Sequence, residues 1–162
     1  MDEVFAPPGA AWQAIAPAYA TVLRIRSLIT LAVLTAGATV PVWLLVGPLW
    51  GSVVIAVGVA WAVWQWFRIP RWVRAWGYAE QDSDLYLRHG LWFRELTVVP
   101  YGRMQAVKVE SGPLSRRLGL ANVQLVTASS QTGATIPGLA RPDAEQLRDR
   151  LIAIGVGDED DL

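Results

Sequence analysis

Several residue types that support common protein chemistry are missing or scarce in this sequence. Its 162 residues include no cysteine, and lysine and histidine occur once each, as Lys108 and His89. Without cysteine, disulfides, thiol nucleophiles and cysteine-ligated metal sites are excluded. A single histidine is too few for a zinc site built from histidines, and the lack of a long basic run disfavours nucleic-acid binding. We therefore predict no metal, no cofactor and no nucleic-acid partner.

Residues with the spacing that catalysis requires are also lacking. Ser129 and Ser130 have no histidine or lysine positioned to activate them, and His89 beside Gly90 is typical of a turn. The chain is therefore predicted not to be an enzyme. We expect four aromatic residues to make core or membrane-proximal contacts rather than a ligand cage: Trp72, Trp76, Trp92 and Phe93.

Acidic residues gather in one short loop. Glu80, Asp82 and Asp84 could bind a divalent cation, but carboxylates at this spacing in a turn are usually solvated. The same loop would repel a phosphate group. We therefore predict neither a metal site nor a phosphate site at this loop.

Charge is absent from residues 27–67, which contain no Asp, Glu, Lys, Arg or His. As one helix this stretch would be about 60 Å long, twice the roughly 30 Å hydrocarbon thickness of a bilayer. Two spans joined by a turn would fit. The alternative is a buried helical hairpin in a soluble protein, but the chain is too short to enclose two helices that are apolar all round.

The turn signal lies near the middle of the apolar stretch. Gly47 and Gly51 permit unusual backbone angles, and Pro48 lacks the amide that a continuing helix needs. We predict a transmembrane hairpin with spans at residues 28–46 and 50–67, turning at these three residues.

Arginines flank the hairpin on both sides, and the turn carries no charge. Arg24 and Arg26 precede the first span, while Arg68, Arg71 and Arg74 follow the second. Because positive residues stay on the cytoplasmic side, both ends of the chain are predicted to be cytoplasmic, in a two-span protein of the cell membrane. Four tryptophans are expected to be interfacial anchors: Trp50, Trp61, Trp64 and Trp66. Small residues four apart would let the helices approach closely: Ala32 and Ala36, Ala56 and Ala60, Gly58 and Ala62.

The regions that flank the hairpin differ from it in the spacing of their apolar residues. Residues 1–26 are predicted to be a cytoplasmic or interfacial segment, with near-helical apolar spacing over residues 12–26. Residues 71–155 alternate short apolar runs with turns, which is typical of an antiparallel β domain; an acidic tail follows at residues 156–162. We expect strands at residues 73–80, 84–88, 91–99, 104–110, 121–127 and 134–137, then a helix from Pro142 that buries Ala144, Leu147, Leu151 and Ile154.

Three local patterns together are similar to a known family. They are Trp12, Pro17 and Tyr19 before a two-span hairpin; Val99-Pro100-Tyr101-Gly102-Arg103-Met104-Gln105 followed by Gly112-Pro113-Leu114-Ser115-Arg116-Arg117-Leu118-Gly119-Leu120; and Val126-Thr127-Ala128 followed by Ile136-Pro137-Gly138-Leu139. The chain resembles the bacterial pleckstrin-homology (PH-like) membrane proteins of the YdbS-like group, from about Trp12 to Ile154.

This resemblance implies a fold and a location but no reaction. The implied fold is a helical membrane hairpin plus a β-rich PH-like domain: seven bent antiparallel strands, forming a partly open barrel, capped by a C-terminal helix. The domain is implied to lie in the cytoplasm. Eukaryotic PH domains that bind phosphoinositides carry basic residues in the loop between their first two strands, where this chain has its acidic loop at residues 80–84.

One group of basic residues is a candidate contact site, composed of Arg103, Lys108, Arg116 and Arg117. These residues could touch lipid headgroups or an acidic partner. The alternative is that Arg103 and Arg116 brace loops by bonding carbonyls while Arg117 is solvated. Two functions follow: a membrane-anchored adaptor that engages another PH-like membrane protein or itself, or a module that binds anionic lipid.

Overall fold

The structure is a computed structural model that describes residues 11–81, 83–91, 94–127 and 133–157, with side chains through residue 154. It divides into two units, Ala20–Arg71 and the combination of Met1–Tyr19 with Trp72–Leu162. We call the first the hairpin and the second the β domain, and describe each by itself.

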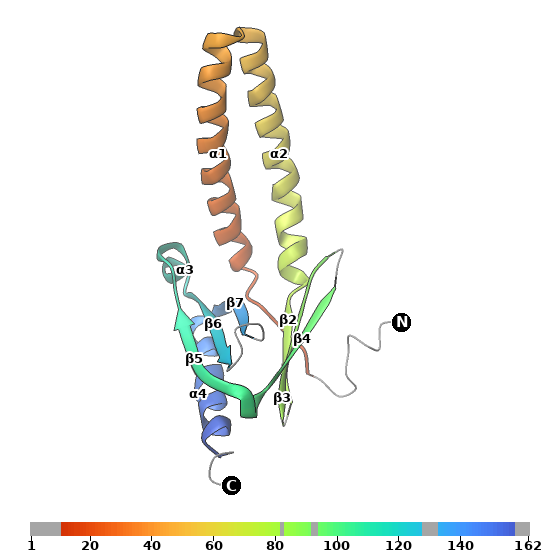
Figure 1. Ribbon diagram of the computed structural model, residues 1–162, viewed down its shortest axis with the longest axis vertical. Coiled ribbons are helices and arrows are strands. Elements are labelled where there is room, and N and C mark those ends of the chain that lie inside the picture. The colour runs from red at the N-terminus through yellow and green to blue at the C-terminus, as the bar shows by residue number, and fades with distance from the viewer. Residues whose placement is uncertain (1–10, 82, 92–93, 128–132, 158–162) are drawn as a thin grey trace. The chain divides into compact units, whose positions relative to one another are not determined.

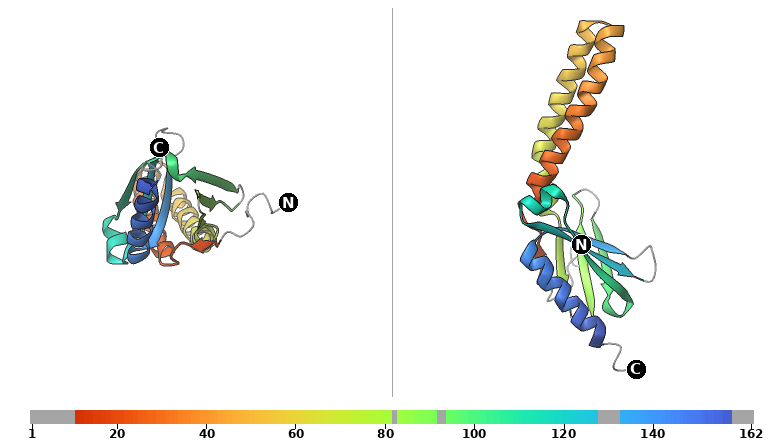
Figure 2. Two further views of the ribbon diagram at one scale, coloured as in Figure 1. Left: turned by 90° about the horizontal axis from the view of Figure 1, so that it is seen from below. Right: turned by 90° about the vertical axis from the view of Figure 1, so that its left-hand side faces the viewer.

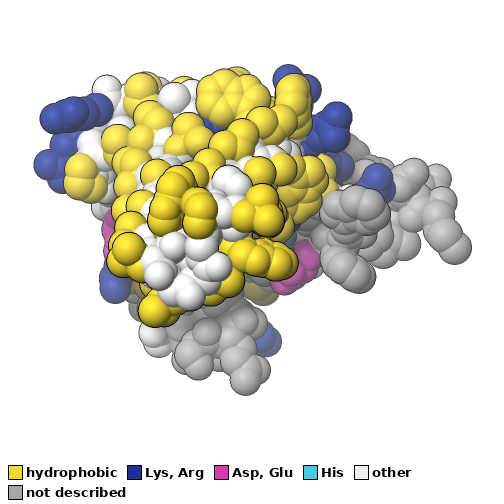
Figure 3. Space-filling view, turned by 90° about the horizontal axis from the view of Figure 1, so that it is seen from above, with side chains coloured by type: hydrophobic (Ala, Val, Ile, Leu, Met, Phe, Trp, Pro, Cys, Tyr) yellow, Lys and Arg dark blue, Asp and Glu magenta, His cyan; other side chains and the backbone are white. Residues whose placement is uncertain are grey.

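The hairpin consists of two helices joined by a short turn (Figure 1). Helix α1 spans Tyr19–Leu45 and α2 spans Pro48–Arg74, and both are long and apolar enough to cross a membrane. Gly47, with a φ of 119°, makes the turn that its sequence predicts. Seen end-on in Figure 3, the hairpin is covered with hydrophobic side chains, as expected for surfaces that face lipid.

Helix α2 continues through Pro70 to Arg74, so the predicted strand start at Val73 is wrong. Proline at position 70 removes the amide that would bond the carbonyl of Trp66, four residues earlier. The Arg24 Nη2 donates to that carbonyl at 3.3 Å, and its guanidinium lies 4.3 Å from the centre of the Trp66 ring. The arginine from α1 therefore satisfies a group that the proline leaves without a helical partner.

Small residues of α2 form the contact with α1, as predicted for Gly58. A Cβ added at Gly58 would lie 2.6 Å from Thr35 Oγ1, and one added at Gly51 would lie 2.7 Å from the Trp43 ring. Four alanines expected to join this contact are instead exposed: Ala32, Ala36, Ala56 and Ala60. Helix phase decides this, because only one face of each helix meets its partner.

The β domain contains two antiparallel sheets and a long C-terminal helix (Figure 1). The first sheet has the order β1-β2-β3-β4, with β1 at Gln13–Ala14, β2 at Gly77–Glu80, β3 at Asp84–His89 and β4 at Glu95–Pro100. The second has the order β5-β6-β7, with β5 at Met104–Glu110, β6 at Leu120–Thr127 and β7 at Ala134–Ala140. The 3₁₀ turn η2 at Tyr101–Arg103 joins the sheets, α3 is Pro113–Arg117, and α4 is Arg141–Gly157.

The first described residues, up to Tyr19, belong to the β domain, so the near-helical spacing over residues 12–26 gives a helix only from Tyr19 onward. Gln13 pairs with Tyr78 in β2, and the Tyr78 hydroxyl donates to Gln13 Oε1 at 2.6 Å. The amide of Ala16 donates to the carbonyl of Gly138 at 2.9 Å, which links this segment to β7. Helix α1 begins only at Tyr19, because the preceding residues satisfy their backbone groups in the sheets.

Helix α4 packs against the second sheet and closes the core (Figure 2). Ala144, Leu147 and Leu151 are almost completely buried as predicted, whereas Ile154 is 39% exposed, so its predicted burial is wrong. The sheets contribute the other large buried side chains: Leu85, Val99, Val123, Leu125 and Ile136. Arg150 Nη2 bonds Glu80 Oε1 at 2.9 Å, so α4 also reaches β2.

Candidate functional site

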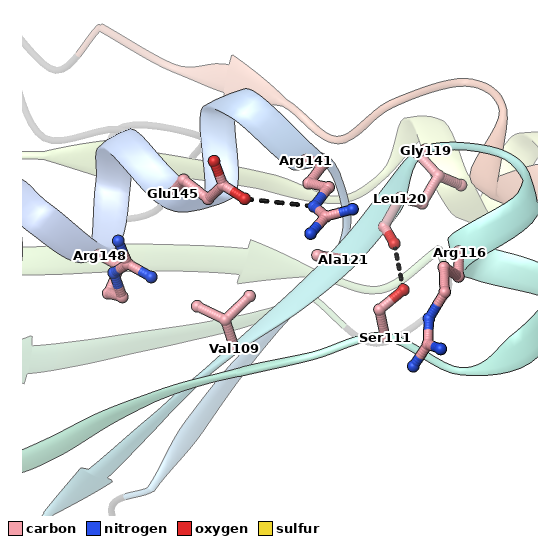
Figure 4. A pocket seen from close by; sticks show the side chains of 9 residues that line it. All are labelled: Val109, Ser111, Arg116, Gly119, Leu120, Ala121, Arg141, Glu145 and Arg148. Carbon is pink, nitrogen blue, oxygen red and sulfur yellow. Dashed lines mark hydrogen bonds and ion pairs between the residues drawn. The ribbon is translucent and has the colours of Figure 1, made fainter.

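A groove of about 480 Å³ lies on the β domain beside the second sheet. In Figure 4, Arg141, Glu145 and Arg148 project from α4 on one side, and Ser111 and Arg116 lie on the other. Val109 and the first residues of β6 lie between them. Three arginines and one glutamate give this arginine groove a formal charge of +2.

A left-handed glycine brings the two sides of the arginine groove together. Gly119 has a φ of 65°, which lets the chain reverse between α3 and β6. Its amide donates to the Arg116 carbonyl at 3.2 Å, and its carbonyl accepts from the Arg141 amide at 2.9 Å. Leu120 pairs with Ala140, so the start of β6 lies beside the end of β7 and the start of α4.

The three arginines of the groove differ in their partners. Arg141 Nε bonds Glu145 Oε1 at 3.2 Å, and Arg148 Nη2 bonds Asp149 Oδ1 at 2.6 Å. Arg116 has no side-chain partner among the residues that the structure describes. Across the groove, the Ser111 hydroxyl donates to the Leu120 carbonyl at 2.7 Å. An anion entering the groove would therefore find one guanidinium free and two held only by exposed carboxylates.

Only one member of the basic group expected from the sequence lines this groove. Arg116 does, while Arg103 lies in η2 and Arg117 is exposed at the end of α3. Lys108 pairs with Gln124 and, being next to Val109 in a strand, points to the opposite face of the sheet. No described carbonyl accepts a bond from Arg103 or Arg116, so the loop-bracing alternative has no support.

Arg141 and Arg148 were not singled out by the sequence. Their separation of seven residues places both on one face of a helix, which is a signal that the sequence did contain. Nothing in the sequence indicates that this face of α4 lies opposite α3. That proximity depends on the pairing of β6 with β7.

The four tryptophans predicted as interfacial anchors are all about half exposed on the hairpin. Trp61 and Trp64 have ring centres 4.9 Å apart, and the Arg68 guanidinium lies 5.0 Å from the centre of the Trp64 ring. Trp66 carries the Arg24 contact, and Trp50 lies next to Gly51 in the first turn of α2. The anchoring role of these residues stays a prediction.

The remaining candidates have structural contacts or lie outside the described residues. His89 stacks on Trp76 with ring centres 4.6 Å apart, and its Nε2 lies 3.6 Å from Glu95 Oε2. Within the described ranges no three acidic or histidine residues cluster as metal ligands. Several residues named from the sequence lie outside those ranges: Asp82, Trp92, Phe93, Ala128, Ser129 and Ser130.

Two tyrosines near the acidic loop have altered acidity. Burial raises the pKa of Tyr101 to about 12, and the nearby carboxylates of Glu80 and Asp84 add to this effect. Burial likewise raises the pKa of Tyr78. The Tyr101 hydroxyl has no hydrogen-bond partner among the described residues, although the Gln81 amide is near enough to lower its pKa slightly. Both tyrosines are neutral core residues at physiological pH.

Comparison with known proteins agrees with this architecture. The sequence model of the bacterial PH domain family matches residues 26–154. The chain belongs to this family. One relative, the UPF0699 transmembrane protein YdbS of Bacillus subtilis (strain 168), is 31% identical over 118 residues, which cover 71% of this chain and 72% of the relative. No solved structure matches the chain significantly.

The family assignment identifies both units of the chain. The β domain is a bacterial PH-like domain, and the two apolar helices are the transmembrane helices of a YdbS-like membrane protein. The chain is therefore a membrane-associated module of the bacterial PH domain family.

Proposed function

We propose that this protein is a membrane-anchored, non-enzymatic adaptor whose PH-like domain pairs with a second PH-like domain, from another copy or from a related membrane protein. The flanking arginines support a cytoplasmic location for both termini and for the domain. A cysteine at Ser52 should then react with an impermeant maleimide on intact cells, and one at Gln124 only after lysis.

The free edge of β4 carries this proposal. In the described strands β4 pairs with β3 alone, so its other edge presents unbonded amides and carbonyls. The charged residue Glu95 and the proline Pro100 stand at its two ends, whereas Leu96, Thr97 and Val98 between them are uncharged, and Val98 is 41% exposed. Such an edge is a template for strand addition unless charge, proline or a bulge protects it.

The free edge of β5 provides a contrast within the same domain. It carries the exposed Lys108 and Glu110 and an irregularity in pairing between Met104 and Ala106. These features discourage pairing with another strand. The difference makes β4 the better docking edge, and the membrane tether raises the local concentration of any partner anchored in the same membrane.

Photocrosslinking in native membranes tests the adaptor function. We expect p-benzoylphenylalanine at Val98 to form an adduct with a second copy or another PH-like membrane protein, identified by mass spectrometry. The control carries the same residue at Gln124, an exposed position on the central strand β6. Val98→Lys, which adds charge to the edge, should abolish association measured by co-purification of two differently tagged copies. Equal crosslinking at both positions, or lipid adducts alone, would contradict the proposal.

Lipid binding is the second candidate function, and it stays a prediction. Of the arginines first assigned to it, Arg103 and Arg117 do not line the arginine groove. The groove itself is the observation that favours an anionic ligand.

A further inference from the structure

The arginine groove has the charge and donor chemistry of an oxyanion site. Arg116 lies on one side of it, and Arg141 and Arg148 lie on the other (Figure 4). The planar guanidinium forks match pairs of phosphate oxygens. Since no described side chain neutralises Arg116, this guanidinium is available to a ligand.

The balance of charge selects among oxyanions. The lining residues carry a formal charge of +2, which Asp149 beside Arg148 partly offsets, and this positive charge attracts a phosphomonoester, which carries about −1.5 to −2 at neutral pH. The Arg141–Glu145 pair has side chains that are 68% and 48% exposed, so it can be exchanged for an anion with little desolvation. A carboxylate ligand would use only one of the three forks.

The volume of the groove indicates more than a bare phosphate. About 480 Å³ is within the range of small-molecule sites, roughly 300–1,000 Å³. The Ser111 hydroxyl donates its proton to the Leu120 carbonyl, but its oxygen can still accept a hydrogen bond from a hydroxylated substituent of the phosphate. Glu80 and Asp84 of the acidic loop lie in strands of the first sheet and do not line this groove.

We propose that Arg116, Arg141 and Arg148 bind the phosphate of a small phosphate ester, either a lipid headgroup or a soluble metabolite. This goes beyond the adaptor function and uses none of the β4 residues. The two proposals can therefore fail separately, because the phosphate site is tested by ligand binding and the adaptor function by crosslinking at Val98.

Binding to the full-length protein in non-ionic detergent tests the proposal. Three ligands are titrated: inorganic phosphate, glycerol 3-phosphate and short-chain dihexanoyl phosphatidic acid. Binding of the lipid alone would identify a headgroup site, and comparable binding of glycerol 3-phosphate would identify a site for soluble esters. Both results support the proposal only if binding depends on the groove, whereas absence of binding by all three would overturn it.

Matched variants decide whether the groove is responsible. Arg116→Gln and Arg141→Gln should each weaken binding about tenfold or more, because each removes a charge-assisted hydrogen bond. Arg117→Gln removes the same charge next to Arg116 but outside the groove, and should change binding less than about twofold. An equal loss in Arg117→Gln would mean diffuse attraction and would overturn the site.

Glu145→Gln supplies a test that misfolding cannot mimic. It frees Arg141 and raises the formal charge of the groove from +2 to +3, so binding should become several-fold tighter. Unchanged or weaker binding in this variant, with thermal stability preserved, would contradict the proposed role of Arg141.

Discussion

In the hairpin, Leu44 and Val33 are 78% and 67% exposed, whereas in the β domain Leu125 and Ile136 are fully buried. The same apolar residue types therefore serve two environments. The hairpin directs its large side chains outward, to lipid, and brings its two helices together through glycines such as Gly58. The β domain directs its large side chains inward, because it must remove them from water.

The largest expected effect lies in the β domain, at Gly138. This glycine has a φ of 65°, and a Cβ there would collide with the Tyr19 ring. Gly138→Ala should reduce the free energy of unfolding by about 3–5 kcal/mol, measured by hydrogen exchange of β6 and β7 in detergent. Gly119→Ala has the same φ of 65° and open space around it, so it should lose only about 1–2 kcal/mol. Equal losses would show that backbone strain alone matters.

A leucine pair tests the contrast in burial directly. Leu147 is completely buried on the inner face of α4, so Leu147→Ala should destabilise the domain by about 2–5 kcal/mol in the same exchange measurement. Leu44→Ala removes the same atoms from a side chain that is 78% exposed on the hairpin. It should change helix exchange protection by less than about 1 kcal/mol, because lipid replaces the lost contacts. A comparable loss at Leu44 would indicate that protein, not lipid, covers that face.

At Gly58 the two helices of the hairpin pack closely, so an added methyl group should be as costly there as in a protein core. Gly58→Ala would bring a Cβ within 2.6 Å of Thr35 Oγ1, so the helices must separate. We expect a loss of about 1–3 kcal/mol in thermal unfolding of the hairpin. Gly37→Ala meets no neighbouring atom and serves as the control, with no loss expected. Tolerance of Gly58→Ala would mean that the interhelical contact is loose.

The smallest expected effect is a pH dependence confined to the β domain. Burial raises the pKa of Tyr101 to about 12 in the folded protein, above its ordinary value of 10.0. Below pH 10 the tyrosine is neutral in both states; between pH 10 and 12 it ionises only when unfolded, so stability falls as pH rises through this window. Tyr101→Phe should lose less stability than the wild type over that interval in a thermal melt. Identical pH profiles would exclude a contribution from Tyr101.

Much of the architecture could be predicted because its signals are local. The charge-free stretch at residues 27–67 predicted the hairpin, Gly47 predicted its turn, and β5 has the bounds expected from alternation and flanking turns. The errors also have physical causes. The second span was predicted to end at residue 67, yet α2 continues through Pro70 to Arg74, and the freed Trp66 carbonyl accepts a hydrogen bond from Arg24, forty-two residues away. No local pattern could reveal that partner.

The candidate site was the least predictable part. Arg116 was recognised within its motif, but Arg141 and Arg148 come from a helix that follows two further strands. Their proximity depends on the Gly119 turn and on the pairing of Leu120 with Ala140. Lys108 was grouped with Arg116 because the two are close in sequence. This was misleading, since strand alternation directs the Lys108 side chain to the opposite face of the second sheet.

The sequence by itself determined that two apolar helices precede a small antiparallel domain, because hydrophobic length and alternation are properties of neighbouring residues. Only the tertiary structure decided that residues 13–14 complete a sheet, that β4 has a free edge, and that three arginines from two helices share one groove. Those features depend on hydrogen bonds and packing between segments far apart in the chain. Patterns among neighbouring residues therefore cannot reveal them.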